Sequence, residues 1–416
     1  MAIIYRAAQF RAAYFFAKRN ILYQHTLDNG IKIIKVPMSA FQSLSAGILV
    51  KVGSRYESPV DAGMSHFIEH MLFKGTVQRP NARLIAEAIE GIGGVSNAYT
   101  SQETTVYYVK VAATQSQTGL DFLADLVKNP LILPAEVEKE RMVIGEEINM
   151  AYDIPDVWVH IQSDAVLWPD HPLGQNIAGT HESLAGITRD RLVEFFEKNY
   201  QPRNMLVALG GAFEPDQVVL QLNDLLGELE PGPASEFDAA PEPQTEPRCH
   251  IERRSIEQGH LCLAMPGLSR TDPDRYALSL LNTILGDGMS SRLFLNIRAE
   301  RGLAYAVDSG LNLLQDTGSL VIYAGTHPDR APEALRAVLD ELEALCQDTV
   351  FDQELTKAKE YLKGRLVLGL EDSYSRAAWF AYQALFLEKI SSPEEVLATY
   401  EAITAAEVQA VAQRVF

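Results

Sequence analysis

Cysteine is scarce in this chain, and its scarcity excludes several kinds of protein. Only three cysteines occur among the 416 residues, at Cys249, Cys262 and Cys346. An odd number with no Cys-x-x-Cys spacing supplies neither a disulfide framework nor a thiolate metal site. The sequence therefore predicts reduced thiols in a reducing compartment, and it gives no support for a cysteine protease.

Long apolar runs and excess positive charge are also missing. No stretch of the sequence approaches the roughly 20 apolar residues that a spanning helix needs, so we expect no membrane-spanning segment. The formal net charge is −19, from 55 acidic and 36 basic residues. Because like charges repel, nucleic acid and anionic membranes are poor partners for this chain, and basic or neutral peptides are better ones.

Length and internal repetition predict two domains. A chain of 416 residues exceeds what one ordinary core organises. Each half is predicted to run strand, helix, strand, helix, helix, and a Pro- and Glu-rich solvated linker separates the halves. The predicted limits are an N-terminal extension (1–22), a metal-binding domain (23–228), the linker (229–248) and a homologous domain without metal ligands (249–416).

The most informative motif is the string His66-Phe67-Ile68-Glu69-His70. In a helix, residues four apart lie on one face, so His66 and His70 can bind the same ion. Zinc accepts such imidazoles, and the carboxylate of Glu69 is placed to take a proton from water during hydrolysis. The alternative is an ordinary amphipathic helix with two histidines on its polar side.

A third ligand is required, because two histidines leave a catalytic zinc one protein ligand short. Residues 136–150 have the apolar periodicity of a helix, and Pro134 suits a helix start. Glu140 and Glu147 are seven residues apart, hence two turns apart on one face of that helix. The alternative interpretation is a solvated acidic helix face.

These two segments together resemble the pitrilysin/insulinase family of zinc metallopeptidases, also called inverzincins, in its short two-domain form. The resemblance implies one Zn²⁺ per chain, held by His66, His70 and Glu147, with Glu69 as the general base. Glu147 lies 147 − 70 = 77 residues after His70 and fits the family spacing best, with Glu146 as its rival. Glu140 matches a family acid that supports the site without binding the metal.

The same resemblance implies substrate contacts. Asn97 and Ala98 fall in an edge strand on which a peptide lies as an added strand. Arg298 and Tyr305 match a pair that contacts the substrate carbonyl oxygen, where a guanidinium and a phenol stabilise a developing oxyanion. The implied fold is α+β, with two homologous α/β sandwich units, each an antiparallel sheet packed on helices, forming a half-clamshell.

The expected function is a zinc-dependent metalloendopeptidase that hydrolyses peptides or unfolded polypeptides inside an enclosed chamber. In the family a complete chamber needs four such units, so a dimer is implied. A second copy of this chain is the expected partner, and a dissimilar chain is the alternative. The expected location is the bacterial cytoplasm. One alternative is the catalytic subunit of a presequence processing peptidase in the mitochondrial matrix, since residues 1–20 are basic, although they lack serine. A non-catalytic core subunit of a respiratory complex is a further alternative, which the intact motif disfavours.

Overall fold

The computed structural model describes residues 22–241 and 244–416, so the basic segment 1–20 lies outside the described residues. Contacts divide the described chain into two compact units. The first holds the described residues up to Glu146 with Ile177–Phe237 and Gly369–Ile390, and the second holds Glu147–Asn176, Asp238–Leu368 and Ser391–Phe416. The domain limits that we expect from the sequence repeat divide the chain differently and remain a prediction.

A six-stranded sheet forms the centre of the first unit, with the order β1-β2-β6-β3-β5-β4. All neighbouring strands are antiparallel except β2 and β6, which are parallel. The sheet is thus antiparallel, as expected, apart from this one parallel pair. The reason is that a long, mostly helical connection, not a hairpin, leads into β6. The strands are β1 (Tyr23–Thr26), β2 (Lys32–Pro37), β3 (Ser43–Val50), β4 (Val95–Thr100), β5 (Thr105–Ala112) and β6 (Met205–Gly211).

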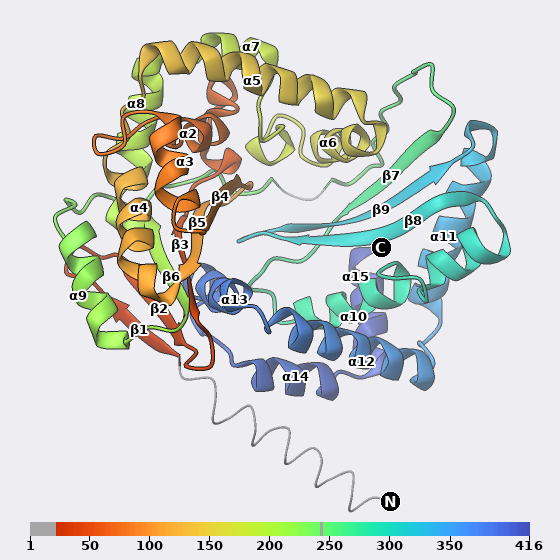
Figure 1. Ribbon diagram of the computed structural model, residues 1–416. Helices are drawn as coiled ribbons and strands as arrows, with labels where there is room; N and C mark the ends of the chain where they lie inside the picture. The colour runs from red at the N-terminus through yellow and green to blue at the C-terminus, as the bar shows by residue number, and fades with distance from the viewer. Residues whose placement is uncertain (1–21, 242–243) are drawn as a thin grey trace, which may run out of the picture. The chain divides into compact units, whose positions relative to one another are not determined.

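Helices cover both faces of this sheet, and the alternation of residues along the strands explains why. In β5, Val106 packs in a cluster with Phe380 of α13, whereas the neighbouring Tyr107 packs beside Phe73 on the opposite face. Figure 1 shows α2, α3 and α4 on one side of the strands and α13 on the other. The helices of this unit are α2 (Met64–Leu72), α3 (Ala82–Glu90), α4 (Ser116–Lys128), the first part of α5 (Pro134–Asp153), α7 (His181–Gly186), α8 (Arg189–Asn199), α9 (Pro215–Leu226) and α13 (Ser373–Phe386).

The start of α2 is fixed by a glycine and a buried acid. Gly63 precedes the helix with φ +95°, a backbone conformation that favours glycine, and an added Cβ there lies 2.7 Å from the Ala178 carbonyl oxygen. The carboxylate of Glu57 accepts hydrogen bonds from the backbone N–H groups of Gly63 (2.8 Å) and Ser65 (2.6 Å). It thereby satisfies donors at a helix start that has no side-chain cap of its own. Burial raises the pKa of Glu57 to about 7.

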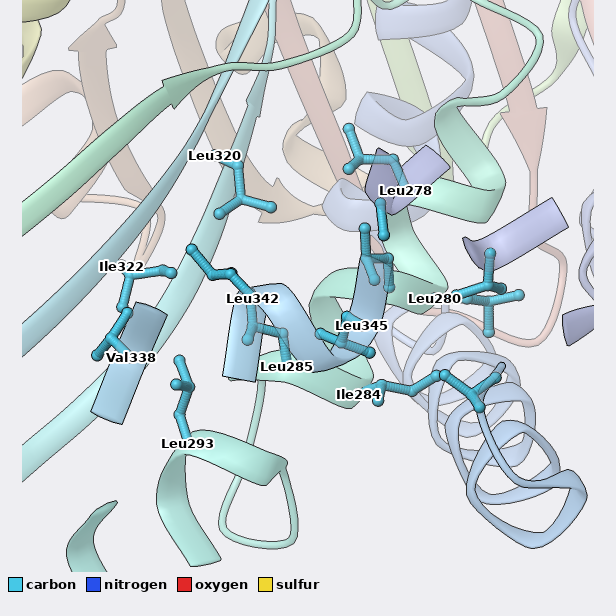
Figure 2. Packing of buried hydrophobic residues seen from close by; sticks show 14 of the residues in the cluster. Leu278, Leu280, Ile284, Leu285, Leu293, Leu320, Ile322, Val338, Leu342 and Leu345 are labelled. Atoms are coloured by element: carbon cyan, nitrogen blue, oxygen red, sulfur yellow. The ribbon is translucent and has the colours of Figure 1, made fainter. Parts of the chain in front are cut away.

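The second unit repeats part of this arrangement. Its sheet has the order β7-β9-β8, which is the order of β3-β5-β4 in the first unit, and both neighbouring pairs are antiparallel. One face packs on α10, α11 and α15 through the apolar cluster in Figure 2, and α6 packs on β7. The mixed α and β composition and the repeated strand order confirm the predicted fold class. The elements are α6 (Pro155–Leu167), β7 (Gly259–Pro266), α10 (Arg275–Leu285), β8 (Ala304–Leu313), β9 (Gly318–Thr326), α11 (Ala331–Gln347), α12 (Asp352–Gly369), α14 (Pro393–Ala402) and α15 (Ala405–Val415).

The segment predicted as a linker has no helix or strand among its described residues. It is nevertheless anchored to the first unit at two points. The Ser235 backbone N–H donates to Oδ1 of Asn204 at 2.9 Å, and the Arg55 guanidinium lies 4.0 Å from the ring centroid of Phe237. Full solvation is thus the wrong description for this end of the linker.

Within the part of the chain that the structure describes, no helix combines the length and apolar content that crossing a membrane requires.

Candidate metal centre

Helix α2 carries the His-x-x-Glu-His motif, as the sequence predicts. Its apolar side, which includes Phe67 and Ile68, is fully buried, while His66, Glu69 and His70 are half-buried. The rings of His66 and His70 lie with their centroids 4.7 Å apart and meet edge to face. The apolar residues of the helix therefore pack into the core, and the two imidazoles lie together on its less buried side.

The carboxylate of Glu147 completes a group of three. One potential ligand atom each from His66, His70 and Glu147 lies within 4.8 Å of the others, and no further residue joins this group among those the structure describes. The rival Glu146 is exposed and is not part of it. Helix α5 is unbroken across the division between the units, so Glu147 is placed by the same helix that carries Glu140.

The donor set fits zinc. Two imidazole nitrogens and one carboxylate oxygen are the ligands of a hydrolytic zinc site. Ligand atoms about 2.1 Å from a tetrahedral ion are about 3.4 Å apart, which modest side-chain rotations reach from the observed spacing. Burial and the neighbouring His70 lower the pKa of His66 to about 4, so this ring is neutral at pH 7. Neutral imidazole is the form that binds a metal.

Glu140 orients one of these histidines. Its Oε2 lies 3.0 Å from Nδ1 of His70, which leaves Nε2 as the nitrogen directed to a metal. Its Oε1 forms an ion pair with Nζ of Lys74 at 2.7 Å, and Glu140 itself is buried. The carboxylate is therefore held from two sides, which fixes the plane of the imidazole. No sequence pattern indicated the ion pair between Lys74 and Glu140.

A groove of about 540 Å³ opens beside the motif and contains Glu69 and His70 in its lining. Helix α3 contributes Ile85 and strand β4 contributes Asn97 to its walls. Among the residues that the structure describes, strand β4 is the last strand of its sheet and pairs with β5 alone, as expected for a strand that receives a peptide. Its outer edge is thus available next to the groove, and the sequence prediction of an edge strand is met here.

One polar contact ties β4 to the motif helix: the hydroxyl of Thr100 donates to Oε2 of Glu69 at 2.5 Å. Within β4 itself, the Ala98 backbone N–H donates to Oδ1 of the neighbouring Asn97 at 2.8 Å. Sequence reasoning placed Asn97 and Ala98 in the site but assigned nothing to Thr100. Its hydroxyl has no sequence signature, because the contact depends on how the strand end meets the helix.

The predicted substrate contacts Arg298 and Tyr305 lie in the second unit. Arg298 is exposed on the helical segment Phe294–Glu300, with its guanidinium 4.8 Å from the ring centroid of Phe294. Tyr305 is exposed on β8, the strand that corresponds to β4 in the repeated sheet order. Their participation in catalysis stays a prediction.

Sequence comparisons identify the relatives of this chain. Residues 38–181 match the family model described as insulinase, peptidase family M16, and residues 186–362 match the model described as the peptidase M16 inactive domain. A protein from Mycobacterium tuberculosis, named an uncharacterized zinc protease, is 38% identical over 391 residues, covering 93% of this chain and 89% of its own. A Bacillus subtilis protein with the same description is 34% identical over 396 residues, covering 95% and 96%.

Solved structures show the same fold. A protease from Helicobacter pylori superposes with a TM-score of 0.87 at 24% identity, covering 95% of this chain and 97% of its own. A structure described as a peptidase M16 inactive domain from Pseudomonas fluorescens gives a TM-score of 0.88 at 22% identity, covering 95% of each chain. The extent of these matches and the names of the curated relatives support a zinc peptidase. The chain belongs to the insulinase family of peptidases, family M16.

Proposed function

We propose that this protein is a zinc-dependent metalloendopeptidase that cleaves peptides or unfolded polypeptide segments. The observation that carries the proposal is the convergence of His66, His70 and Glu147 beside Glu69. Two imidazoles and a carboxylate form a hydrolytic donor set, and the carboxylate of Glu69, which is not part of that set, stands next to them. The groove and the edge strand β4 give an extended peptide a place beside that set.

Each residue of the site has a distinct role in the proposed reaction. His66, His70 and Glu147 would hold the zinc ion, which would supply Lewis acidity to water and to the peptide carbonyl. Glu69 accepts a proton from the attacking water and returns it to the departing amine. The backbone of β4 holds the peptide extended, so recognition depends on main-chain groups more than on sequence. Glu140 holds the His70 ring in its metal-binding orientation.

Three further parts of the proposal rest on the family resemblance. Arg298 and Tyr305 donate hydrogen bonds to the substrate carbonyl oxygen near the bond that is cleaved. One Zn²⁺ is bound per chain, and two copies of the chain form the working enzyme around an enclosed chamber. The substrate is a peptide or an unfolded segment, because a chamber admits chains that are short or extended.

The test compares the wild-type protein with Glu69→Gln on an internally quenched peptide library, with the zinc content of each measured. We expect Glu69→Gln to keep its zinc and to lose at least about 10³-fold in turnover, because only the base is removed. Glu87→Gln is the matched control, since Glu87 is exposed on α3 and pairs with Arg83. Cleavage by Glu69→Gln at the wild-type rate, or wild-type cleavage that survives a chelator, contradicts the proposal.

A further inference from the structure

Glu69 does not hold its own carboxylate in place. The terminal torsion of a glutamate joins an sp³ carbon to an sp² carbon, and its energy profile is broad. A general base works best when the accepting oxygen already faces the proton it removes, because a displacement of about 1 Å can cost about 100-fold in rate. Some other group is therefore needed to fix the orientation of the Glu69 carboxylate.

Thr100 meets this requirement. Its Oγ1 lies 2.5 Å from Oε2 of Glu69, a length typical of a strong hydrogen bond from a hydroxyl to a charged oxygen. Threonine has few side-chain rotamers because it is branched at Cβ, so its hydroxyl is a stiff donor. Thr100 is half-buried at the last position of β4, where it is opposite Thr105 of β5.

The end of β4 is itself held in place. Immediately after Thr100, the Ser101 backbone N–H donates to the Thr104 carbonyl at 2.7 Å and closes a tight turn. Immediately before it, the Tyr99 hydroxyl lies 3.0 Å from that of Tyr382 and 3.4 Å from that of Tyr374, both on α13. The strand end is thus tied on either side of Thr100, and its hydroxyl has a defined position relative to α2.

We propose that Thr100 is a positioning residue of the general base, and that its hydroxyl helps to fix the Glu69 carboxylate in the orientation that accepts a proton. The inference rests on the proposed peptidase function and deepens it. Thr100 contacts the Glu69 carboxylate and is not one of the three residues that would hold the ion, so it acts on the rate of the chemical step through Glu69. Because the hydroxyl is the acting group, serine can replace threonine, whereas valine, which has the same shape, cannot.

The experiment measures kcat, KM, zinc content and thermal stability for the wild type, Thr100→Val, Thr100→Ser and the control Thr118→Val. Thr118 is half-buried on α4 and contacts Gln115, away from the motif. We expect Thr100→Val to lower kcat by about 10- to 100-fold, while KM, zinc content and Tm stay near wild-type values. Thr100→Ser retains most of the wild-type kcat.

A second readout does not depend on turnover. In the Glu69→Gln background, adding Thr100→Val leaves the Kd of a bound peptide unchanged, because the substitution alters a side chain and leaves the β4 backbone that holds the peptide intact. Wild-type kcat in Thr100→Val overturns the inference, as do equal losses in the serine and valine variants accompanied by lower Tm. A wild-type protein without zinc-dependent cleavage overturns the proposed function itself, and that outcome is read from the wild-type arm alone.

Discussion

Helices α2 and α10 occupy corresponding places in the two units, yet their side chains have different roles. Each follows the first strand of the shared three-strand pattern, β3-β5-β4 in one unit and β7-β9-β8 in the other. From Ala277 to Leu285, α10 buries every residue except Ser279. In α2 the buried residues leave one side for His66, Glu69 and His70, and the last two of these line the groove. The comparison indicates that packing requires only the apolar side of such a helix, so the other side is available for chemistry.

The largest effect is expected from His70→Ala. Removing this imidazole leaves two ligands, so we expect zinc to be lost from the purified protein and hydrolysis to fall by at least about 10³-fold. Metal analysis and peptide turnover measure both effects. His25→Ala, on the exposed strand β1, is the control and retains zinc. A His70→Ala protein with stoichiometric zinc and normal turnover contradicts the ligand assignment.

A corresponding truncation in α10 is expected to lower the stability of the protein without changing its metal binding. Leu285 is fully buried in the cluster of Figure 2, which also contains Leu342 and Leu345. Leu285→Ala should lower the free energy of unfolding by about 2–5 kcal/mol through lost burial and a residual cavity. Chemical denaturation measures this loss. The control Leu339→Ala, on the exposed side of α11, should cost far less, and equal costs contradict the packing account.

Glu57→Gln tests the buried acid at the start of α2. Burial raises the pKa of Glu57 to about 7, so between pH 4.5 and 7 the folded state binds more protons at this site than the unfolded state. This residue therefore costs stability progressively as the pH rises through that window, by up to about 3 kcal/mol. Gln cannot ionise, so the stability of the variant relative to wild type should rise between pH 5 and 8. Denaturation at both pH values measures the difference, and a constant or opposite difference contradicts the prediction.

The smallest effect is expected from Glu140→Gln. Gln can still contact Nδ1 of His70, but without charge it polarises the imidazole less, so we expect zinc affinity to fall by about 10- to 100-fold. Competition with a chromophoric chelator measures the affinity. The control Glu138→Gln lies on the same helix and pairs with Arg141 at the surface, and its affinity should match wild type. An unchanged zinc affinity in Glu140→Gln contradicts the proposed orienting role of Glu140.

Several elements could be predicted because local periodicity specifies them. The motif helix and the helix with Glu140 and Glu147 occur where the periodicity indicates. The edge strand with Asn97 and Ala98 occurs where the family resemblance implies it. Contacts between distant segments could not be predicted. The parallel pairing of β2 with β6 and the packing of α13 on the sheet of the first unit join residues far apart in the chain. No local pattern encodes such partners, because many strands and helices have compatible apolar faces.

The sequence by itself determined that His66 and His70 share one helix face, since the period of the α-helix fixes residues four apart on the same side. It also supplied the candidate acids for the metal site, which are Glu140, Glu146 and Glu147. Only the tertiary structure decided that Glu147 joins the imidazoles, that Glu140 supports His70, and that Thr100 contacts Glu69. The reason is physical: helix geometry fixes distances within an element, whereas distances between elements follow from how their apolar faces pack.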